Sequence, residues 1–120
     1  MTRPPLIDRA VIDDMFDYIG ADSARSVLEL FVSESRNYLA IIAEASAHPA
    51  DAARRERARR AAHSLKSGAG QIGLPAVAAA AASVECTAAP NAPDLIQAAA
   101  ALQQCTAVTI EALRHLLNSA

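Results

Sequence analysis

Residues 62–74 read AHSLKSGAGQIGL, and this stretch contains two signals that belong to different folds. From residue 68 to residue 73 it spells G-x-G-x-x-G, the glycine spacing of a dinucleotide-binding loop. Such a loop lies between a strand and a helix, whereas the residues before it are helical in composition and period. His63 and Lys66, three residues apart, instead lie on one face of a helix. The stretch therefore predicts a helix that presents a histidine, and the glycine spacing is a coincidence of small residues.

The composition of the chain favours one small helical domain, residues 1–120. Of the 120 residues, 52% are hydrophobic and only 3% are aromatic, so alanine and aliphatic side chains must fill the core. Alanine is the best helix former, and its small side chain lets helices approach closely. The formal net charge of −2 gives no general attraction to nucleic acid.

The sequence has no features of a secreted or membrane protein. The N-terminus lacks the apolar core of a signal peptide, and no stretch approaches the ~20 apolar residues that span a bilayer. Cys86 and Cys105 lack C-x-x-C spacing and indicate free thiols, as expected in a reducing compartment. Neither His48 nor His115 has a histidine or carboxylate four residues later in the chain, so no metal site is predicted. We expect a cytoplasmic protein.

Apolar residues that recur every three or four positions predict five helices and no strand. The first begins at Asp8, its N-cap, and ends at Gly20, while Asp22 or Ser23 caps the second. The predicted ranges are about 8–19, 23–48, 51–72, 75–88 and 94–118, with a connection at 88–93. Short connections make successive helices antiparallel neighbours. The predicted fold class is therefore all-α, an antiparallel four-helix bundle with a short N-terminal capping helix.

The third helix has an apolar face and an opposite, polar face. Its predicted buried stripe consists of Ala58, Ala61, Ala62, Leu65, Ala69 and Ile72. Its opposite face carries Arg59, Arg60, His63, Lys66, Ser67 and Gly70. The same helix holds most of the basic charge, since residues 54–66 contain five arginines and the only lysine against one glutamate.

That polar face suits phosphoryl chemistry. An exposed, neutral imidazole is a competent nucleophile at neutral pH. Its attack on a phosphoryl group leaves a dianionic phosphoramidate, which Lys66 and the neighbouring arginines can stabilise. The small side chains of Ser67 and Gly70 leave room for a second protein above His63. The alternative is an ordinary surface histidine on a basic helical face.

The same residues resemble a family motif. The histidine-containing phosphotransfer (HPt) domain family has the pattern H-x-L-K-G-x-[SA]-x-x-[ILV]-G. The matching positions here are His63, Leu65, Lys66, Ala69, Ile72 and Gly73. Ser67 stands where the family has a glycine, and its small side chain preserves access to the histidine. The resemblance covers nearly the whole chain.

The resemblance implies a phosphorelay intermediate, a phosphocarrier with little catalytic machinery of its own. The histidine would accept a phosphoryl group from an aspartate of a receiver domain or a hybrid histidine kinase. It would pass the group to the receiver of a response regulator. The family's receivers supply the Mg²⁺, so this chain needs no cofactor, and no ATP-binding motif is present. A free-standing monomer is expected.

Glu85 is the predicted partner of the histidine. The turn between the third and fourth helices centres near Leu74, eleven residues from both His63 and Glu85. Antiparallel packing therefore places the two side chains at one level, roughly 16 Å from the turn. The family has an acidic or amide residue on this helix that hydrogen-bonds the imidazole. Gln71 could reach the phosphoryl site from the docking face, or be a solvated amide.

Two other functions remain open. The chain could be an interaction module that docks receivers or kinases without carrying phosphate, although such modules would be expected to lack the histidine or the lysine. It could also resemble the dimerisation domain of a histidine kinase. Against that, the kinase helix usually has Glu or Asp after its histidine, and here Ser64 follows His63.

Overall fold

The computed structural model describes residues 3–88 and 94–118, and within them every regular element is a helix. The helices are α1 (Arg9–Ile19), α2 (Ala21–Ala47), α3 (Ala52–Gln71), α4 (Pro75–Thr87) and α5 (Leu95–Asn118). The all-helical fold class is confirmed, and each helix begins and ends within two residues of its predicted range. Of the predicted connection at 88–93, only Ala88 lies in the described part of the chain.

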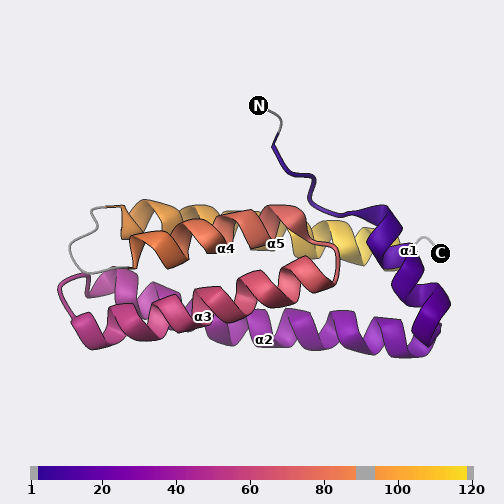
Figure 1. The fold of residues 1–120 in the computed structure, drawn as a ribbon, viewed down its shortest axis with the longest axis horizontal. Coiled ribbons are helices and arrows are strands. Elements are labelled where there is room, and N and C mark those ends of the chain that lie inside the picture. The colour runs from indigo at the N-terminus through magenta and orange to yellow at the C-terminus, as the bar shows by residue number, and fades with distance from the viewer. Residues whose placement is uncertain (1–2, 89–93, 119–120) are drawn as a thin grey trace.

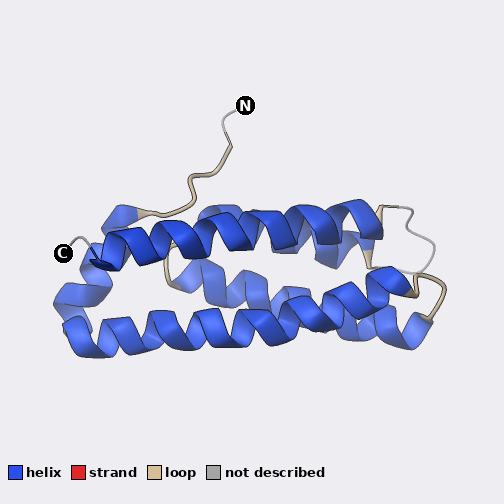
Figure 2. Ribbon diagram, turned by 180° about the vertical axis from the view of Figure 1, so that it is seen from behind, coloured by secondary structure: helices blue, strands red, loops and turns tan. Residues whose placement is uncertain are grey.

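The four longer helices lie side by side along the long axis of the molecule, with each antiparallel to the one before it (Figure 1). Helix α2 packs on α3, α3 on α4, α4 on α5, and α5 returns to pack on α2. Helix α1 crosses one end of this group, where it contacts the beginning of α2. Seen from behind, α2 and α5 form the opposite face of the molecule (Figure 2).

Small side chains allow α3 to approach its neighbours closely. The buried face of α3 includes Ala58, Ala62 and Ala69, which are fully inaccessible to solvent. Leu65 is the large side chain of this face, and Ile72 is only partly buried. Because most of the interface is alanine, the position of α3 depends on close contact along its length rather than on a few large side chains.

The predicted cap of α2 is wrong. Gly20 is the only residue between α1 and α2, and its φ of 88° turns the chain from one helix into the other. An N-cap residue precedes the first helical residue, but Asp22 and Ser23 already lie inside α2, which begins at Ala21. Asp22 instead lies in the first turn of α2, where its negative charge interacts favourably with the helix dipole.

The turn after α3 ties the chain to its N-terminal segment. Gly73, with φ 83°, follows the last residues of α3, and the N–H of Leu74 returns to the carbonyl of Ala69 at 2.9 Å, which closes a Schellman motif. The carbonyl of Gly73 accepts a hydrogen bond from the N–H of Asp8 at 2.8 Å. This turn therefore fixes both the start of α4 and the position of α1.

Candidate functional site

Helix α3 presents His63 to solvent from the middle of its polar face. Asp51 is the N-cap of this helix, and its side chain accepts hydrogen bonds from the N–H groups of Ala53 and Arg54. Between Ala58 and Gly70, the positions face either the core or solvent in the order that the 3.6-residue period requires. The side chain of His63 is 58% exposed.

Glu85 on α4 contacts the imidazole ring directly, in the register expected from the sequence. Its Oε2 lies 2.7 Å from Nδ1 of His63. Because an ionised carboxylate can only accept, Nδ1 carries the proton and donates it in this bond. The lone pair of the neutral ring is then on Nε2, which has no hydrogen-bond partner among the described residues. The nucleophilic nitrogen thus faces away from Glu85.

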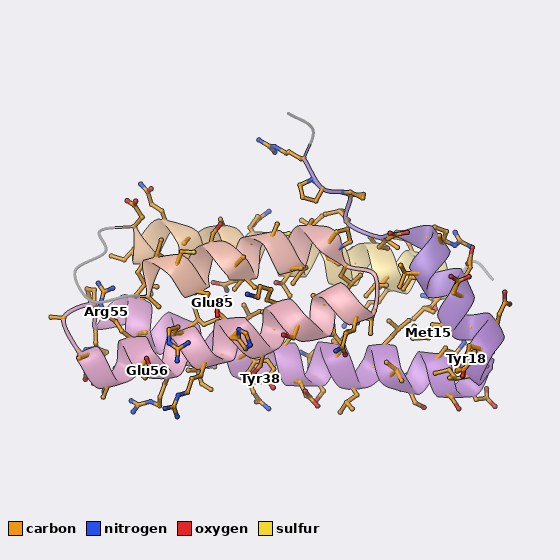
Figure 3. All side chains as sticks on the ribbon, in the orientation of Figure 1. Met15, Tyr18, Tyr38, Arg55, Glu56 and Glu85 are labelled. Atoms are coloured by element: carbon orange, nitrogen blue, oxygen red, sulfur yellow. The ribbon has the colours of Figure 1, made fainter. Side chains whose placement is uncertain are left out.

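The same carboxylate also holds Lys66. The ammonium of Lys66 donates to Oε1 of Glu85 at 2.6 Å, so each carboxylate oxygen of Glu85 has one partner. Figure 3 labels Glu85 on α4 and Glu56 on α3. The pKa of Glu85 lies below its ordinary value because Lys66, and then His63, donate to the carboxylate; partial burial opposes this effect. With its side chain 20% exposed, Glu85 is the most shielded member of the three.

The two arginines before His63 are paired with another glutamate. Glu56 accepts from Nε and Nη2 of Arg59 at 3.0 and 2.6 Å, and from Nε of Arg60 at 3.3 Å. These contacts, the hydrogen bonds from Arg59 above all, lower the pKa of Glu56 to about 2. In this structure both arginines therefore contact Glu56, and their predicted role in docking stays a prediction. The sequence analysis did not single out Glu56. It precedes Arg59 and Arg60 by three and four residues, the spacings at which oppositely charged side chains pair on a helix.

Between His63 and the end of α3, the polar face of the helix is open to solvent and includes two small residues. Ser67, Gly70 and Gln71 are exposed, and a Cβ atom added to Gly70 would meet nothing within 4 Å. Gly68 faces the other way, since a Cβ atom added there would lie 3.9 Å from the ring of Phe31 on α2. The predicted docking residues therefore lie on one side of α3, with Arg59 and Arg60 before His63 and the uncharged Ser67, Gly70 and Gln71 after it.

These features have a family-level explanation. A family model described as Hpt domain matches residues 26–119, from within α2 to the end of α5. The chain belongs to the Hpt domain family. No curated protein and no solved structure matches the chain. Hpt domains take part in histidine phosphotransfer in two-component phosphorelays, where they interact with receiver domains and kinases.

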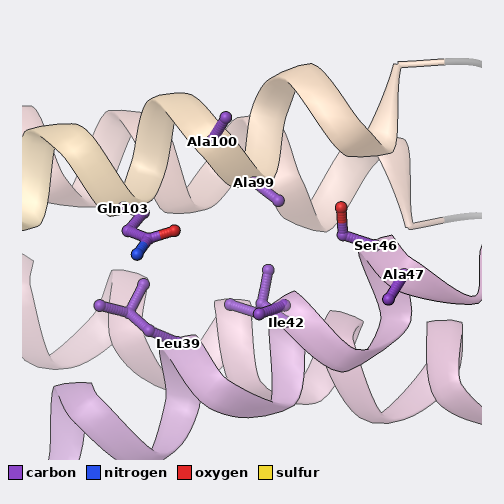
Figure 4. A pocket seen from close by; sticks show the side chains of 8 residues that line it. Leu39, Ile42, Ser46, Ala47, Ala99, Ala100 and Gln103 are labelled. Atoms are coloured by element: carbon purple, nitrogen blue, oxygen red, sulfur yellow. The ribbon is translucent and has the colours of Figure 1, made fainter.

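The other histidine–carboxylate contact in the described chain is longer than a hydrogen bond, with Nε2 of His48 3.6 Å from Oε1 of Glu44. A pocket of about 220 Å³ lies between α2 and α5, on the face away from His63, and no ionisable side chain lines it (Figure 4). No cluster of three metal-ligating side chains occurs within residues 3–88 and 94–118. The helices described are also too short or too polar to cross a membrane.

Proposed function

We propose that this Hpt domain is a phosphorelay intermediate in which His63 is the phosphoacceptor. It takes the phosphoryl group from a receiver aspartate of a hybrid histidine kinase and passes it to the receiver of a response regulator. The observation that carries the proposal is the orientation of His63, whose Nδ1 is bound to Glu85 while the exposed ring leaves Nε2 open to a second protein. We infer that α2–α5 act as a four-helix bundle with α1 as its cap, which holds α3 and α4 in register.

The transfer step uses an acyl phosphate on the partner. The Nε2 lone pair attacks phosphorus, an N–P bond forms, and the O–P bond to the aspartate breaks, with its electron pair leaving on the aspartate carboxylate. Since Nδ1 keeps its proton, the ring gains positive charge as the new bond forms. The carboxylate of Glu85, 2.7 Å from Nδ1, stabilises that charge, and the reverse reaction delivers the group to the next receiver.

The remaining residues of the face bind rather than react. Lys66 lies one helical turn beyond His63, so its flexible side chain can exchange Glu85 for the phosphoryl group. Ser67, Gly70 and Gln71 leave space for the partner surface. Mg²⁺ belongs to the receiver, where it neutralises the phosphoryl oxygens during transfer. The chain itself acts as a monomer and requires no cofactor for this step.

The test is phosphoryl transfer from a receiver that has been phosphorylated beforehand. Wild-type protein should acquire an acid-labile, base-stable label, and His63→Ala should acquire none while keeping its helix content. His115→Ala is the matched control, because it removes another exposed histidine from α5 and should label normally. Labelling of the His63 variant would refute the proposal. Binding of the receiver without labelling of the wild type would favour the interaction module instead.

A further inference from the structure

Glu56 lies on the same face of α3 as His63 but has no role in the transfer step described above. It precedes His63 by seven residues, which is close to two helical turns, and Arg59 and Arg60 lie between the two residues. The side chain of Glu56 is 46% exposed, and those of Arg59 and Arg60 are 43% and 75% exposed. The three charges therefore form part of the surface that a partner must cover.

The contact between Glu56 and Arg59 occupies one particular edge of the guanidinium. Nε and Nη2 together form the edge that binds a carboxylate or phosphate through two parallel hydrogen bonds. In Arg59 both atoms donate to the two oxygens of Glu56. Glu85 adds a second negative charge within electrostatic reach of Arg59. An incoming anion must displace Glu56 before it can use this edge.

The partners of this face are anionic where they meet it. An acyl phosphate carries negative charge on its phosphoryl oxygens, and the Mg²⁺ of the receiver offsets only part of the combined charge of the phosphoryl group and its carboxylate ligands. We propose that Glu56 is a specificity-determining residue of the docking face. It competes with the partner's anionic group for Arg59. It also repels a partner surface that places no positive charge opposite Glu56.

The identity of the partner rests on the proposed function. The competition between Glu56 and an anion for Arg59 does not. Inorganic phosphate serves as a probe that needs no phosphorylation of His63. Its binding can be followed through the Nε–Hε signal of Arg59 in NMR titrations of the full chain. Exposed ion pairs contribute little, so Glu56→Gln should raise phosphate affinity at Arg59 about two- to fivefold, with a steeper salt dependence.

Two further variants make the phosphate experiment decisive. Glu111→Gln changes the net charge equally on α5, a helix that packs on α2 and α4 rather than on α3, and should leave affinity at Arg59 unchanged. Combining Glu56→Gln with Arg59→Gln should abolish the gain, as measured by the phosphate-induced shifts of neighbouring backbone amides. Unchanged affinity in Glu56→Gln, an equal gain in Glu111→Gln, or a gain that persists without Arg59 would each overturn the inference.

Transfer from a phosphorylated receiver supplies the second readout. Glu56→Gln should lower the KM for an acidic receiver while leaving kcat unchanged, because docking improves and the chemistry at His63 does not change. An unchanged KM, or a change confined to kcat, would contradict a role in docking. If wild-type protein accepts no phosphoryl group from any receiver, the proposed function fails, and the phosphate titration still decides whether Glu56 competes for Arg59.

Discussion

At the scale of single residues, the chemistry of the site depends on how one carboxylate is shared. Glu85 binds His63 through one oxygen and Lys66 through the other, so it fixes the imidazole tautomer and holds the ammonium of Lys66 in the resting structure. A phosphoryl group on Nε2 would offer Lys66 a second, more highly charged partner. The resting contacts are therefore exchangeable, as expected for pairs that border solvent.

Replacing Glu85 with alanine should slow phosphoryl uptake about tenfold, since the ring loses the acceptor that fixes its tautomer and stabilises its developing charge. Helix content should not change. Ring ¹⁵N chemical shifts of His63 measure the tautomer directly, and uptake from a phosphorylated receiver measures the rate. A tautomer that is the same in both proteins would contradict the assigned role of Glu85.

The pH dependence of stability provides an independent measurement on the same residue. The pKa of Glu85 is lower in the folded chain than its ordinary value of 4.5, so the ionised carboxylate stabilises the fold above that pH. This stabilisation is lost as the pH falls below 4.5 and through the folded-state pKa. The Tm difference between wild type and Glu85→Gln should accordingly be present at neutral pH and shrink in acid. A Tm difference that grows in acid would contradict a lowered pKa of Glu85 in the folded chain.

Lys66→Ala should slow transfer several-fold without abolishing it. The ammonium is partly exposed, with 36% of its side chain accessible, so its interaction with a phosphoryl dianion is screened by solvent and salt. Lys66→Arg retains the charge and should restore part of the rate. Measurement at low and high salt should show the largest difference from wild type at low salt, and equal rates at low salt would exclude any contribution from Lys66.

At the scale of helices, the sequence predicted the elements well and their caps less well. Asp51, Gly73 and Pro75 mark helix ends by strong local chemistry, and they stand at or next to the bounds of the predicted ranges 51–72 and 75–88. Gly20 serves two helices at once, and local capping preferences do not reveal this because the sharp corner depends on how α1 packs. The pairing of His63 with Glu85 was predictable because it follows from a turn position and a constant rise per residue.

Substitutions at Gly73 and Gly70 test the structure at the end of α3, because they should change the stability of the fold with opposite signs. A Cβ on Gly73 would lie 2.9 Å from Cβ of Val11, and its φ of 83° is unfavourable for any other residue, so Gly73→Ala should destabilise by about 1–3 kcal/mol. Gly70→Ala introduces a better helix former into open space and should stabilise by up to ~1 kcal/mol. Urea denaturation of both variants measures these changes. Equal effects would show that the turn is not constrained as described.

At the scale of the whole molecule, the polar residues inside the fold were the hardest to predict. Arg55 belongs to a basic run that looks solvated, yet it is only 8% exposed, and its guanidinium donates to the carbonyls of Pro49 and Thr87. It joins the connection before α3 to the end of α4, opposite the turn at Gly73. Charge patterning gives the number of cations but not which one turns inward. The available signal was its spacing of three and seven residues from Ala58 and Ala62, which places it in line with the buried stripe.

Two threonines lie in the core, away from the phosphoryl chemistry. Thr106 and Thr109 on α5 are fully buried, and within the described residues neither hydroxyl oxygen has a hydrogen-bond partner. Valine has nearly the same shape and is also β-branched, so Thr109→Val removes an unsatisfied hydroxyl at little packing cost. Since such a group costs about 1–3 kcal/mol, the variant should be more stable by ~1 kcal/mol in urea denaturation.

Thr87 supplies the matched control for that substitution. Its hydroxyl donates to the carbonyl of Ser83 at 3.0 Å, so Thr87→Val removes a satisfied hydrogen bond and should not stabilise the fold. Phosphoryl uptake should be unchanged in Thr109→Val, because the substitution keeps the volume of the side chain and neither His63 nor Glu85 lies on α5. A stabilised variant with slower uptake would show instead that the reactive face depends on flexibility of the whole core.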